Sequence, residues 1–395
     1  MASGLKIAIV SSGLGHASRG PETWAKKTAR VLHDMGEDVT LFKGAGRPEM
    51  PYERVCRCIA GHGRAARLLS RLLPPQTWHL GLGSRQGIHE TSFALRLLLH
   101  LRHSFDVVHT HDPHVVMALQ RARKVRLIRA PAILGHGTYE PEEFLGKLEF
   151  VQHLAPHYLE EARRQGRARE GWTAIGNFVD TDVFRPGRAG NLRRRYGVAE
   201  DAFVVLSVAA IGTRLKRVDY LLREFGAFRE RAREKVELVV AGASTDETPE
   251  LVRMGREMLG SSVHFLPDRP HEEMPRIYRL GDVYALCSLW DMMPNALLEA
   301  VASGLPSLVS THPVVGWMVG PGGQQVAMQQ EGALAAALER YLDPELRRRE
   351  AGAARRHAVE QFGKEVIVKQ YVQMYREVVA LANGAAAPGR QPRWQ

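Results

Sequence analysis

Two hydrophobic patterns alternate along most of the chain: short runs of Val, Ile and Leu, and longer segments whose apolar residues recur at helical spacing. Near-continuous apolar strands that alternate with helices are typical of parallel sheets covered on both faces. The pattern therefore predicts an α/β fold. The expected strands are residues 6–12, 38–42, 106–110, 130–135 and 172–175, followed by 203–209, 236–241, 263–266, 283–287 and 307–310. The expected helices are residues 21–35, 92–101, 142–165, 217–231, 272–280 and 331–342.

The two series of strands predict two Rossmann-like, doubly wound domains. We expect the first domain over residues 1–180 and the second over residues 181–363, with a hinge near 177–186. A basic amphipathic helix at 364–382 is expected to complete the first domain, and the Ala-, Gly-, Pro- and Arg-rich residues 383–395 are expected to be disordered. Ligands of such folds bind at the carboxyl ends of the strands, so we expect the site in the cleft between the domains.

Residues 291–299, Asp-Met-Met-Pro-Asn-Ala-Leu-Leu-Glu, follow the predicted strand 283–287 and carry an acid at each end. Because Pro is favoured in the first turn of a helix, the predicted helix starts at Pro294. The free N–H groups of a first turn form an anion site, and Asn295 and Glu299, four positions apart, share a face. The stretch therefore offers a phosphate site and two carboxylates, which suit a ligand with both phosphates and sugar hydroxyls.

The bulk composition is that of a soluble globular protein. Apolar residues make up 45% and charged residues 25% of the chain, and no apolar run is long enough to cross a bilayer. The three cysteines do not make a disulfide framework. The first apolar strand begins so close to Met1 that we expect no signal peptide. A reducing, cytoplasmic setting fits these features best.

The net charge of +11 is unevenly distributed, with about +8 in residues 1–180 by count. Such a charge attracts anionic lipid or nucleic acid. Because no nucleic-acid-binding motif accompanies it, we expect no nucleic-acid partner. Residues 56–90, which include Arg-Leu-Leu-Ser-Arg-Leu-Leu, leave two interpretations open. The first interpretation is that these residues make a peripheral contact with an anionic membrane or an acceptor. The second is that they form an ordinary surface helix and loop.

Three clusters imitate metal sites, and we expect no metal at any of them. Cys56 and Cys58 lack further ligands at zinc spacing. The histidines within 109–114 occupy the end of a strand, where consecutive side chains point in different directions, although one of them could line an acceptor site. Asp180 and Asp182 form an Asp-x-Asp triplet inside the hinge, where turn chemistry is the better interpretation.

A glycine-rich loop precedes the first predicted helix and is suited to holding an acceptor or donor phosphate at the helix N-terminus. Its candidate residues are Gly13, Gly15, His16 and Gly20. The loop also imitates a dinucleotide-binding fingerprint, with Ser18 in the third glycine position. A dehydrogenase needs an acid after the second strand to bind the ribose. Because Lys43 stands there instead, we expect no dehydrogenase and no NAD.

Four motifs in order along residues 5–380 resemble those of GT-B glycosyltransferases of the large retaining family 4. Residues 291–299 with the following Ala-Val-Ala-Ser-Gly-Leu-Pro resemble the family's Glu-x7-Glu motif. The hinge Asn-Phe-Val-Asp-Thr-Asp-Val-Phe-Arg-Pro is similar to the family's Asn-x-Val-Asp-x-x-x-Phe-x-Pro. Arg19-Gly-Pro-Glu22 stands where the family often has Gly-Gly-x-Glu, and residues 211–222 resemble the segment that carries the phosphate-binding lysine.

The resemblance implies transfer of a sugar from a nucleotide-diphosphate sugar to a glycan, lipid-linked or small-molecule acceptor. It implies retention of configuration, without a metal or cofactor. His136 would lie beside the donor sugar and Asp291 on its hydroxyls, while Lys216 would stabilise the leaving phosphate; these three are the implied catalytic residues. Glu299 would bind the ribose. The implied donor-binding set is Arg214, Lys216, Asp291, Met293, Pro294, Asn295, Ala296, Leu297 and Glu299.

Two departures from the family pattern leave alternatives open. The first acid of the pair is Asp291 rather than Glu, which shortens its reach by one methylene group. Ala210-Ile211 replaces the Gly-Arg pair usually found upstream of Lys216, and Arg214 is the candidate replacement cation. The alternatives to glycosyl transfer are another GT-B enzyme, such as a sugar-nucleotide epimerase or a sugar-phosphate synthase, and a non-catalytic carbohydrate-binding protein with the same fold.

Overall fold

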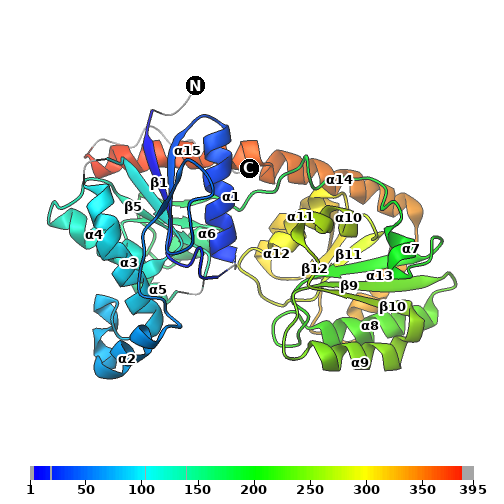
Figure 1. Ribbon diagram of the computed structural model, residues 1–395. Helices are drawn as coiled ribbons and strands as arrows, with labels where there is room; N and C mark the ends of the chain where they lie inside the picture. The colour runs from blue at the N-terminus through cyan, green and yellow to red at the C-terminus, as the bar shows by residue number, and fades with distance from the viewer. Residues whose placement is uncertain (1–3, 18–19, 103, 139, 385–395) are drawn as a thin grey trace. The chain divides into compact units, whose positions relative to one another are not determined.

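The computed structural model describes residues 4–17, 20–102, 104–138 and 140–384. The chain divides into two compact units (Figure 1). The first comprises Met1–Gly176 and Val368–Gln395, and the second comprises Asn177–Ile367. Each unit is built around one parallel sheet, so the expected α/β class is confirmed. Nearly all of the expected disordered tail, residues 385–395, lies outside the described residues.

The first unit contains a seven-stranded sheet in the order β3-β2-β1-β4-β5-β6-β7, with every pair parallel. The chain adds strands outward on one side of β1 and then, from β4, on the other side. The central strands are fully buried, which is why they read as continuous apolar runs. The strands are β1 (Lys6–Ser11), β2 (Asp38–Lys43), β3 (Glu53–Val55), β4 (Val107–Thr110), β5 (Ala132–His136), β6 (Phe150–His153) and β7 (Trp172–Ala174).

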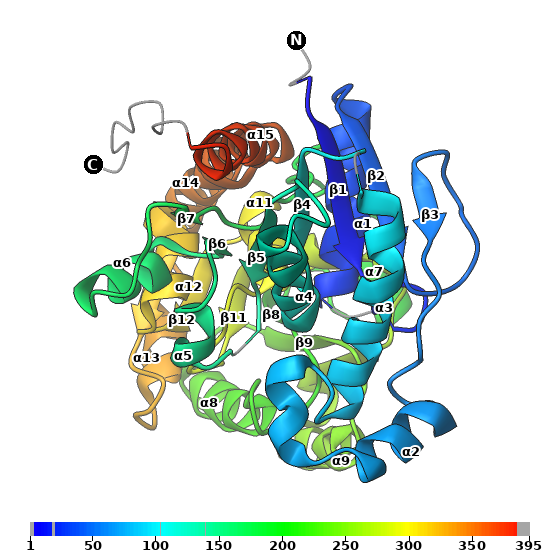
Figure 2. The same cartoon turned by 90° about the vertical axis from the view of Figure 1, so that its left-hand side faces the viewer.

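Helices cover both faces of this sheet (Figure 2). On one face, Leu97 of α3 and Leu119 of α4 belong to the same core as Val10 of β1. On the other, α1 and α15 meet, and the Trp24 indole donates a hydrogen bond to the Tyr371 hydroxyl at 3.2 Å. The helices are α1 (Gly20–Asp34), α2 (Arg64–Leu72), α3 (Arg85–Leu101), α4 (Pro113–Lys124), α5 (Glu142–Leu145), α6 (Pro156–Arg164) and α15 (Lys364–Ala382), with a 3-10 turn at Pro75–Leu80.

The second unit contains a six-stranded parallel sheet in the order β10-β9-β8-β11-β12-β13. Its strands are β8 (Phe203–Val208), β9 (Val236–Gly242), β10 (Val263–Pro267), β11 (Val283–Leu286), β12 (Ser307–Ser310) and β13 (Gly323–Val326). One face packs against α8, α9 and α13 through Phe225, Leu251 and Leu334. The helices are α7 (Leu192–Tyr196), α8 (Val218–Arg231), α9 (Thr248–Leu259), α10 (Met274–Tyr278), α11 (Asn295–Ala302), α12 (Pro313–Val319), α13 (Ala333–Arg340) and α14 (Pro344–Phe362), with 3-10 turns at Gly260–Ser262, His271–Glu273 and Gly320–Gly322.

The expected helix over residues 142–165 is wrong, because the buried strand β6 separates α5 from α6. The short apolar run of this strand also fits helical spacing, which is why one long helix is expected from the sequence. Pro156 marks the start of the second helix, α6. The edge strands β3 and β13 were not expected: each pairs on one side only, and Gly-Gln-Gln-Val of β13 has no apolar run. The helix over 364–382 is confirmed as α15. In the described part of the chain, every helix is too short or too polar to cross a membrane.

Candidate functional site

The carboxyl ends of β8 and β11 define the topological switch point of the second sheet, because the strand order turns outward in opposite directions from this pair. The loop after β8 carries Lys216, and the loop after β11 carries Asp291. The Lys216 ammonium and the Asp291 carboxylate form an ion pair there, with side chains 23% and 18% exposed. Residues 75 positions apart are thus joined where ligands of this topology bind.

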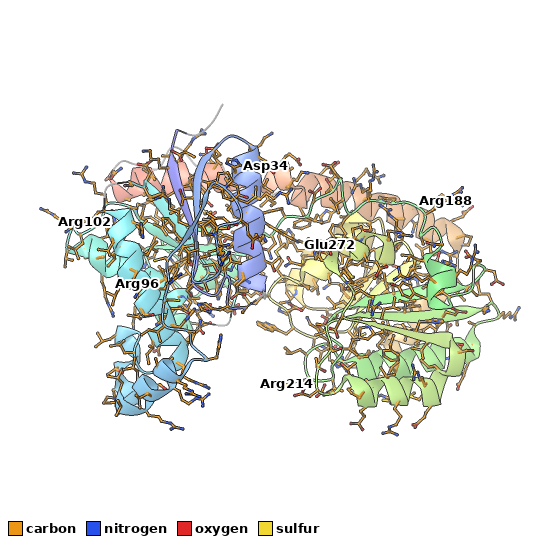
Figure 3. The ribbon with its side chains drawn as sticks, viewed as in Figure 1. Asp34, Arg96, Arg102, Arg188, Arg214 and Glu272 are labelled. Carbon is orange, nitrogen blue, oxygen red and sulfur yellow. The ribbon has the colours of Figure 1, made fainter. Side chains whose placement is uncertain are left out.

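The Lys216 loop is held by the residue that follows it. Arg217 adopts a left-handed backbone with φ of 51°, which is uncommon for a residue other than glycine. Its guanidinium donates to the Met328 carbonyl at 2.8 Å and lies 4.2 Å from the Tyr220 ring centroid. These contacts fix the turn into α8 and therefore the direction of Lys216. Arg214, labelled in Figure 3, is exposed on the same loop.

The helix at the Pro-Asn motif begins one residue later than expected, at Asn295, because Pro294 has an extended backbone and occupies the N-cap position. No side chain caps this end. The side-chain oxygen Oδ1 of Asn295 instead accepts a hydrogen bond at 3.2 Å from the side-chain amide Nδ2 of Asn177, in the hinge motif. The backbone N–H of Asn177 lies 3.1 Å from the Met293 sulfur. The first N–H groups of α11, which include that of Ala296, therefore keep their capacity to bind an anion.

Glu299 lies one turn inside α11 and is buried. One of its oxygens, Oε2, accepts a hydrogen bond from the Tyr278 hydroxyl at 3.0 Å. The other, Oε1, lies 3.4 Å from Nε2 of His271, whose side chain is 55% exposed. Burial, with Glu299 adjacent, raises the pKa of Tyr278 well above its usual value, so this hydroxyl stays a donor. Glu299 thus has one oxygen held by the buried Tyr278 hydroxyl and a second oxygen that faces the solvent-exposed side chain of His271.

The Asp180–Asp182 triplet forms a turn, as expected. Asp180 Oδ1 accepts hydrogen bonds from the backbone N–H groups of Asp182 and Val183 at 3.0 and 3.3 Å. The Lys364 ammonium lies 3.1 Å from an Asp180 oxygen and 2.9 Å from an Asp182 oxygen. Arg355 donates to the carbonyls of Thr181, Phe184 and Ala302, which ties the hinge motif to the end of α11.

His136 is the last residue of β5, in the first unit. Its Nδ1 lies 3.0 Å from Nδ1 of His153, so one of these atoms donates and the other accepts. Its Nε2 lies 3.6 Å from Glu140. Burial lowers the pKa of His136 to about 4, and burial together with His136 lowers that of His153 to about 3. Both imidazoles are therefore neutral near pH 7. The position of His136 beside a donor sugar stays a prediction.

The switch point of the first sheet, between β1 and β4, holds a buried carboxylate, Asp112, which the sequence places among the histidines within 109–114. Asp112 Oδ2 accepts a hydrogen bond at 2.6 Å from the Ser12 backbone N–H. Glu90 of α3 accepts one at 2.9 Å from the His114 N–H. Burial raises the pKa of Asp112, and burial with Asp112 nearby raises that of Glu90 to about 8. The position of Asp112 directly after a strand was an available signal; Glu90 offered none.

The glycine-rich loop leaves β1 at this same switch point. The N–H groups of His16 and Ala17 donate to the Gly13 carbonyl at 2.9 and 3.0 Å. Gly15 needs its glycine, since φ is +92° and a Cβ there would lie 2.3 Å from the Ala45 carbonyl oxygen. Gly20 is exposed and opens α1. Gly13 and His16 line a cavity of about 510 Å³, so half of the predicted loop residues face one hollow of the first unit. Their ligand stays a prediction.

Two of the histidines at the end of β4 are buried. His109 Nδ1 lies 2.9 Å from the Tyr375 hydroxyl of α15, and the His111 ring lies 4.0 Å from that of Trp24. Burial lowers the pKa of both, that of His111 to about 3. His114 is half-buried, and an acceptor role for one member of the cluster stays a prediction.

Comparison with known proteins agrees with this geometry. Residues 189–358 match the family described as glycosyl transferases group 1. D-inositol 3-phosphate glycosyltransferase 1 of Catenulispora acidiphila is 26% identical over 334 residues, 76% of this chain and 77% of that protein. Alignments with several further glycosyltransferases span about half of this chain and about half of each relative.

Two solved structures share the fold over nearly their whole length. Sucrose-phosphate synthase from Thermosynechococcus elongatus has a TM-score of 0.74 at 20% identity, with 95% of this chain and 99% of that chain covered. Anabaena Alr3699/HepE, in complex with UDP and glucose, has a TM-score of 0.70 at 15% identity, with 94% and 99% covered. The second unit thus resembles the group 1 glycosyltransferases over residues 189–358, and the two parallel-sheet units share the fold of these solved structures.

Proposed function

We propose that the chain transfers a hexosyl or related sugar from a nucleotide-diphosphate donor to a hydroxyl acceptor with retention of configuration, and that the donor site needs no metal ion. The observation that carries this proposal is the Lys216–Asp291 pair at the switch point of the second sheet, beside the uncapped α11. A diphosphate leaving group needs cations and N–H donors where its charge develops. Lys216, the exposed Arg214 and the first turn of α11 supply both kinds of group.

The ion pair suggests how the donor is admitted. Without a donor, Lys216 and Asp291 neutralise one another. A bound diphosphate competes with Asp291 for the lysine, which frees the carboxylate to accept hydrogen bonds from the sugar hydroxyls. Both roles fall to side chains that are already in place. Lys216 then stabilises the departing phosphate electrostatically, and Asp291 orients the sugar.

Glu299 is the proposed ribose ligand. Its Oε2 is fixed by Tyr278, so the carboxylate keeps one orientation. Its Oε1 faces His271, whose exposed side chain can move aside when a ribose hydroxyl takes its place. A carboxylate with one free oxygen can accept from a hydroxyl of the ribose. This arrangement supports a nucleotide donor over a free sugar phosphate.

A donor panel tests the proposal. The purified protein is scanned for thermal shift with UDP-, GDP- and ADP-sugars, and the best donor is then assayed for nucleoside diphosphate release with candidate hydroxyl acceptors. Proton NMR of the glycoside gives the anomeric configuration. We expect one nucleotide to raise the melting temperature and the product to keep the donor's configuration. An inverted product, or loss of turnover in EDTA that manganese restores, contradicts the corresponding part of the proposal.

We further propose a peripheral contact of the first unit with anionic membrane, through α2. Only Ala66 of this nine-residue helix is buried. Leu68 and Leu72 are 61% and 69% exposed. At 100° per residue, these leucines adjoin a stripe of arginines, a pattern typical of helices that lie in a lipid interface. The stripe consists of Arg64, Arg67 and Arg71.

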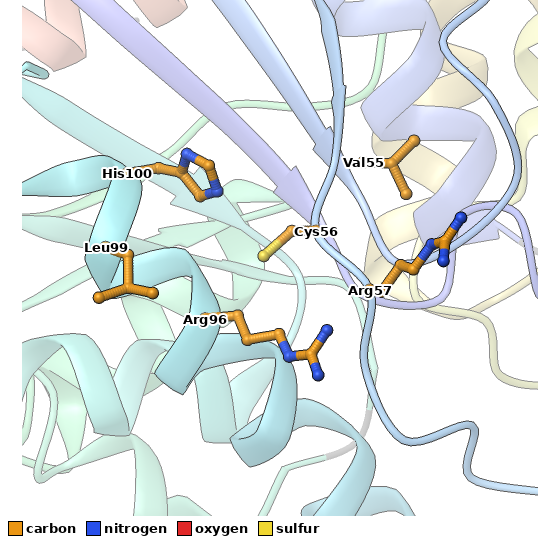
Figure 4. A pocket seen from close by; sticks show the side chains of 6 residues that line it. All are labelled: Val55, Cys56, Arg57, Arg96, Leu99 and His100. Carbon is orange, nitrogen blue, oxygen red and sulfur yellow. The ribbon is translucent and has the colours of Figure 1, made fainter.

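A basic hollow lies along the C-terminal part of α3, the helix against which α2 packs. It has a volume of about 410 Å³ and lies between the segment after β3 and α3 (Figure 4). Arg57 and Arg96 line it together with His100. Cationic side chains around a hollow suit the phosphate of a lipid head group.

Vesicle sedimentation tests this contact. Phosphatidylglycerol vesicles are expected to sediment the protein at low salt and to release it at high salt, and phosphatidylcholine vesicles are expected not to sediment it. Leu68→Ser with Leu72→Ser is expected to weaken sedimentation several-fold, because both leucines lose their apolar contact. The exposed Leu215, in the second unit, supplies the matched control Leu215→Ser. Equal sedimentation by both vesicle types contradicts the proposal.

A further inference from the structure

Three metal-ligating side chains from separate segments meet in the first unit. They are His16 of the glycine-rich loop, Cys58 of the segment after β3, and His89 of α3. The Cys58 sulfur lies 3.7 Å from His16 Nε2 and 3.6 Å from His89 Nδ1. One ligand atom from each of the three lies within 4.8 Å of the others. Of the three, only His16 has a role among the predicted site residues, as part of the glycine-rich loop.

The spacing suits a tetrahedral zinc ion. With Zn–S near 2.3 Å and Zn–N near 2.0–2.1 Å, a sulfur and a nitrogen on the same zinc lie about 3.5 Å apart. The two sulfur–nitrogen distances in the cluster are close to this value. We propose that His16, Cys58 and His89 form a binding site for a zinc ion. All three ligands belong to the first unit, whereas the proposed donor residues belong to the second, so the proposal does not rest on the proposed sugar transfer.

The ligand set selects among metals. A thiolate with two imidazoles favours zinc and other borderline or soft ions over magnesium, calcium or manganese. Three protein ligands leave a fourth position open, as in zinc sites that bind water or a substrate. His16 and His89 line the cavity of about 510 Å³, so the open position is reachable from solvent. His62 lines the same cavity, with its ring centroid 5.9 Å from that of His16, and is a candidate for this fourth position.

The backbone around the cluster holds the ligands in place before a metal arrives. His16 sits in a turn closed by its own N–H bond to the Gly13 carbonyl. His89 is buried, and its Nδ1 lies 2.9 Å from the Ile59 carbonyl oxygen. The distance of 3.6 Å to the Cys58 sulfur makes this same Nδ1 the ligand atom, so zinc binding replaces its bond to Ile59.

The proposal departs, for Cys58, from the sequence-based expectation that Cys56 and Cys58 have no metal role. Cys56 takes no part: its sulfur lies 3.9 Å from the Phe93 carbonyl, inside the core. The partners of Cys58 come instead from 42 and 31 residues away in sequence, at spacings that match no zinc motif. An ion here ties the glycine-rich loop to α3 and so fixes one wall of the cavity.

Metal titration of the tag-free, chelator-stripped full chain tests the proposal. We expect about one equivalent of zinc per chain by mass spectrometry of the dialysed protein. Cobalt(II) is expected to give tetrahedral d–d bands and a thiolate charge-transfer band. Cys58→Ser is expected to remove the charge-transfer band and to weaken zinc binding by at least about tenfold, because the anionic ligand is lost. Cys56→Ser, the matched control two residues away, is expected to bind within about twofold of the wild type.

Two outcomes overturn the proposal: no uptake of zinc or cobalt by the wild type, or equal losses in Cys58→Ser and Cys56→Ser. Circular dichroism melts of the metal-free variants show whether each is folded, and His62→Ala, an exposed position, provides a second variant if Cys58→Ser misfolds. With His62→Ala, the cobalt charge-transfer band is expected to remain, because the thiolate stays bound; loss of this band also counts against the site. Sugar transfer by Cys58→Ser in chelator separates this site from any metal effect at the donor site.

Discussion

Each of the two sheets has a topological switch point at the carboxyl ends of its central strands. The side chains at the two switch points differ in their exposure to solvent and in their charge. At the second, between β8 and β11, an ammonium and a carboxylate pair while partly exposed to solvent. At the first, between β1 and β4, Asp112 is buried and accepts a backbone N–H, with Glu90 and several buried histidines close by. The second switch point therefore offers charged side chains that a ligand can reach. The first holds buried titratable groups whose burial disfavours the charged form.

The two units differ in how they relate to the known family and in their buried histidines. The reachable charges suit a diphosphate and lie within the stretch that matches the glycosyltransferase family, residues 189–358. In the described residues, every histidine whose pKa burial lowers belongs to the first unit: His16, His109, His111, His114, His136 and His153. The family match does not extend to this unit. Features of the first unit are therefore inferred from this chain's own residues.

The largest expected effect on activity comes from removing a charged side chain near the second switch point. Lys216→Ala and Glu299→Ala are each expected to lower kcat/KM by about 10²–10³-fold, because each removes a charged contact to the donor in a partly desolvated site. Initial rates of nucleoside diphosphate release measure this. Lys235→Ala, which removes an exposed lysine paired with Glu237, is the matched control. Activity within threefold of wild type in Lys216→Ala contradicts the assigned role.

Acid is expected to unfold the first unit before the second. The pKa of His136 is lowered to about 4 and those of His111 and His153 to about 3, so below pH 6.5 the unfolded chain binds protons that the folded chain does not. Each such group weakens folding by up to about 1.4 kcal/mol per pH unit below pH 6.5. Glu90, with its pKa raised to about 8, acts in the opposite direction between pH 8 and 4.5. Asp112 and Glu140, whose pKa values burial also raises, act the same way, but the six histidines with lowered pKa values outnumber these three carboxyls.

Hydrogen exchange read by mass spectrometry at pH 7, 5.5 and 4.5 checks this order of unfolding, after correction for the intrinsic exchange rate. Peptides of β4 and β5 are expected to lose protection at a higher pH than peptides of β8 and β9. Earlier loss in β8 and β9 contradicts the assignment of acid sensitivity to the buried histidines. His153→Gln, which removes one of them, is expected to shift the loss to lower pH.

Asp291→Glu is expected to change turnover less than the loss of Lys216 or Glu299 does. The longer carboxylate can still reach Lys216 and restores the acid that the family usually has, so turnover is expected to stay within about tenfold of wild type. The kcat and KM values for the best donor measure it, with Asp291→Ala as the loss-of-charge reference. A collapse equal to that of Asp291→Ala would mean that this site uses a geometry of its own.

The smallest expected effect concerns the hinge triplet. Asp182→Asn removes an exposed charge paired with Lys364 but keeps the Asp180 turn, so turnover with and without added manganese is expected to lie within about twofold of wild type. The exposed Asp246 provides the control Asp246→Asn. A manganese-dependent rate that Asp182→Asn abolishes would show the triplet to be a metal site after all.

How well the sequence predicted the fold depended on burial. Strands such as β1 and β8, buried on both faces, gave unbroken apolar runs and were found within a residue or so. The edge strand β13 was missed because its solvent side allows Gln324 and Gln325. Strand β6 was assigned to a helix because its short apolar run fits both periodicities, and only its pairing with β5 and β7 decides between them.

The sequence by itself determined the α/β class, the order of the elements and the residue types at the second switch point, because periodicity and turn residues are local properties. Only the tertiary structure decided which distant residues meet. It paired Lys216 with Asp291, aimed Asn295 at the hinge, suppressed the charges of His136 and Glu90 by burial, and gathered His16, Cys58 and His89. Such contacts depend on strand order and on the direction in which loops leave the sheet, which local spacing does not encode.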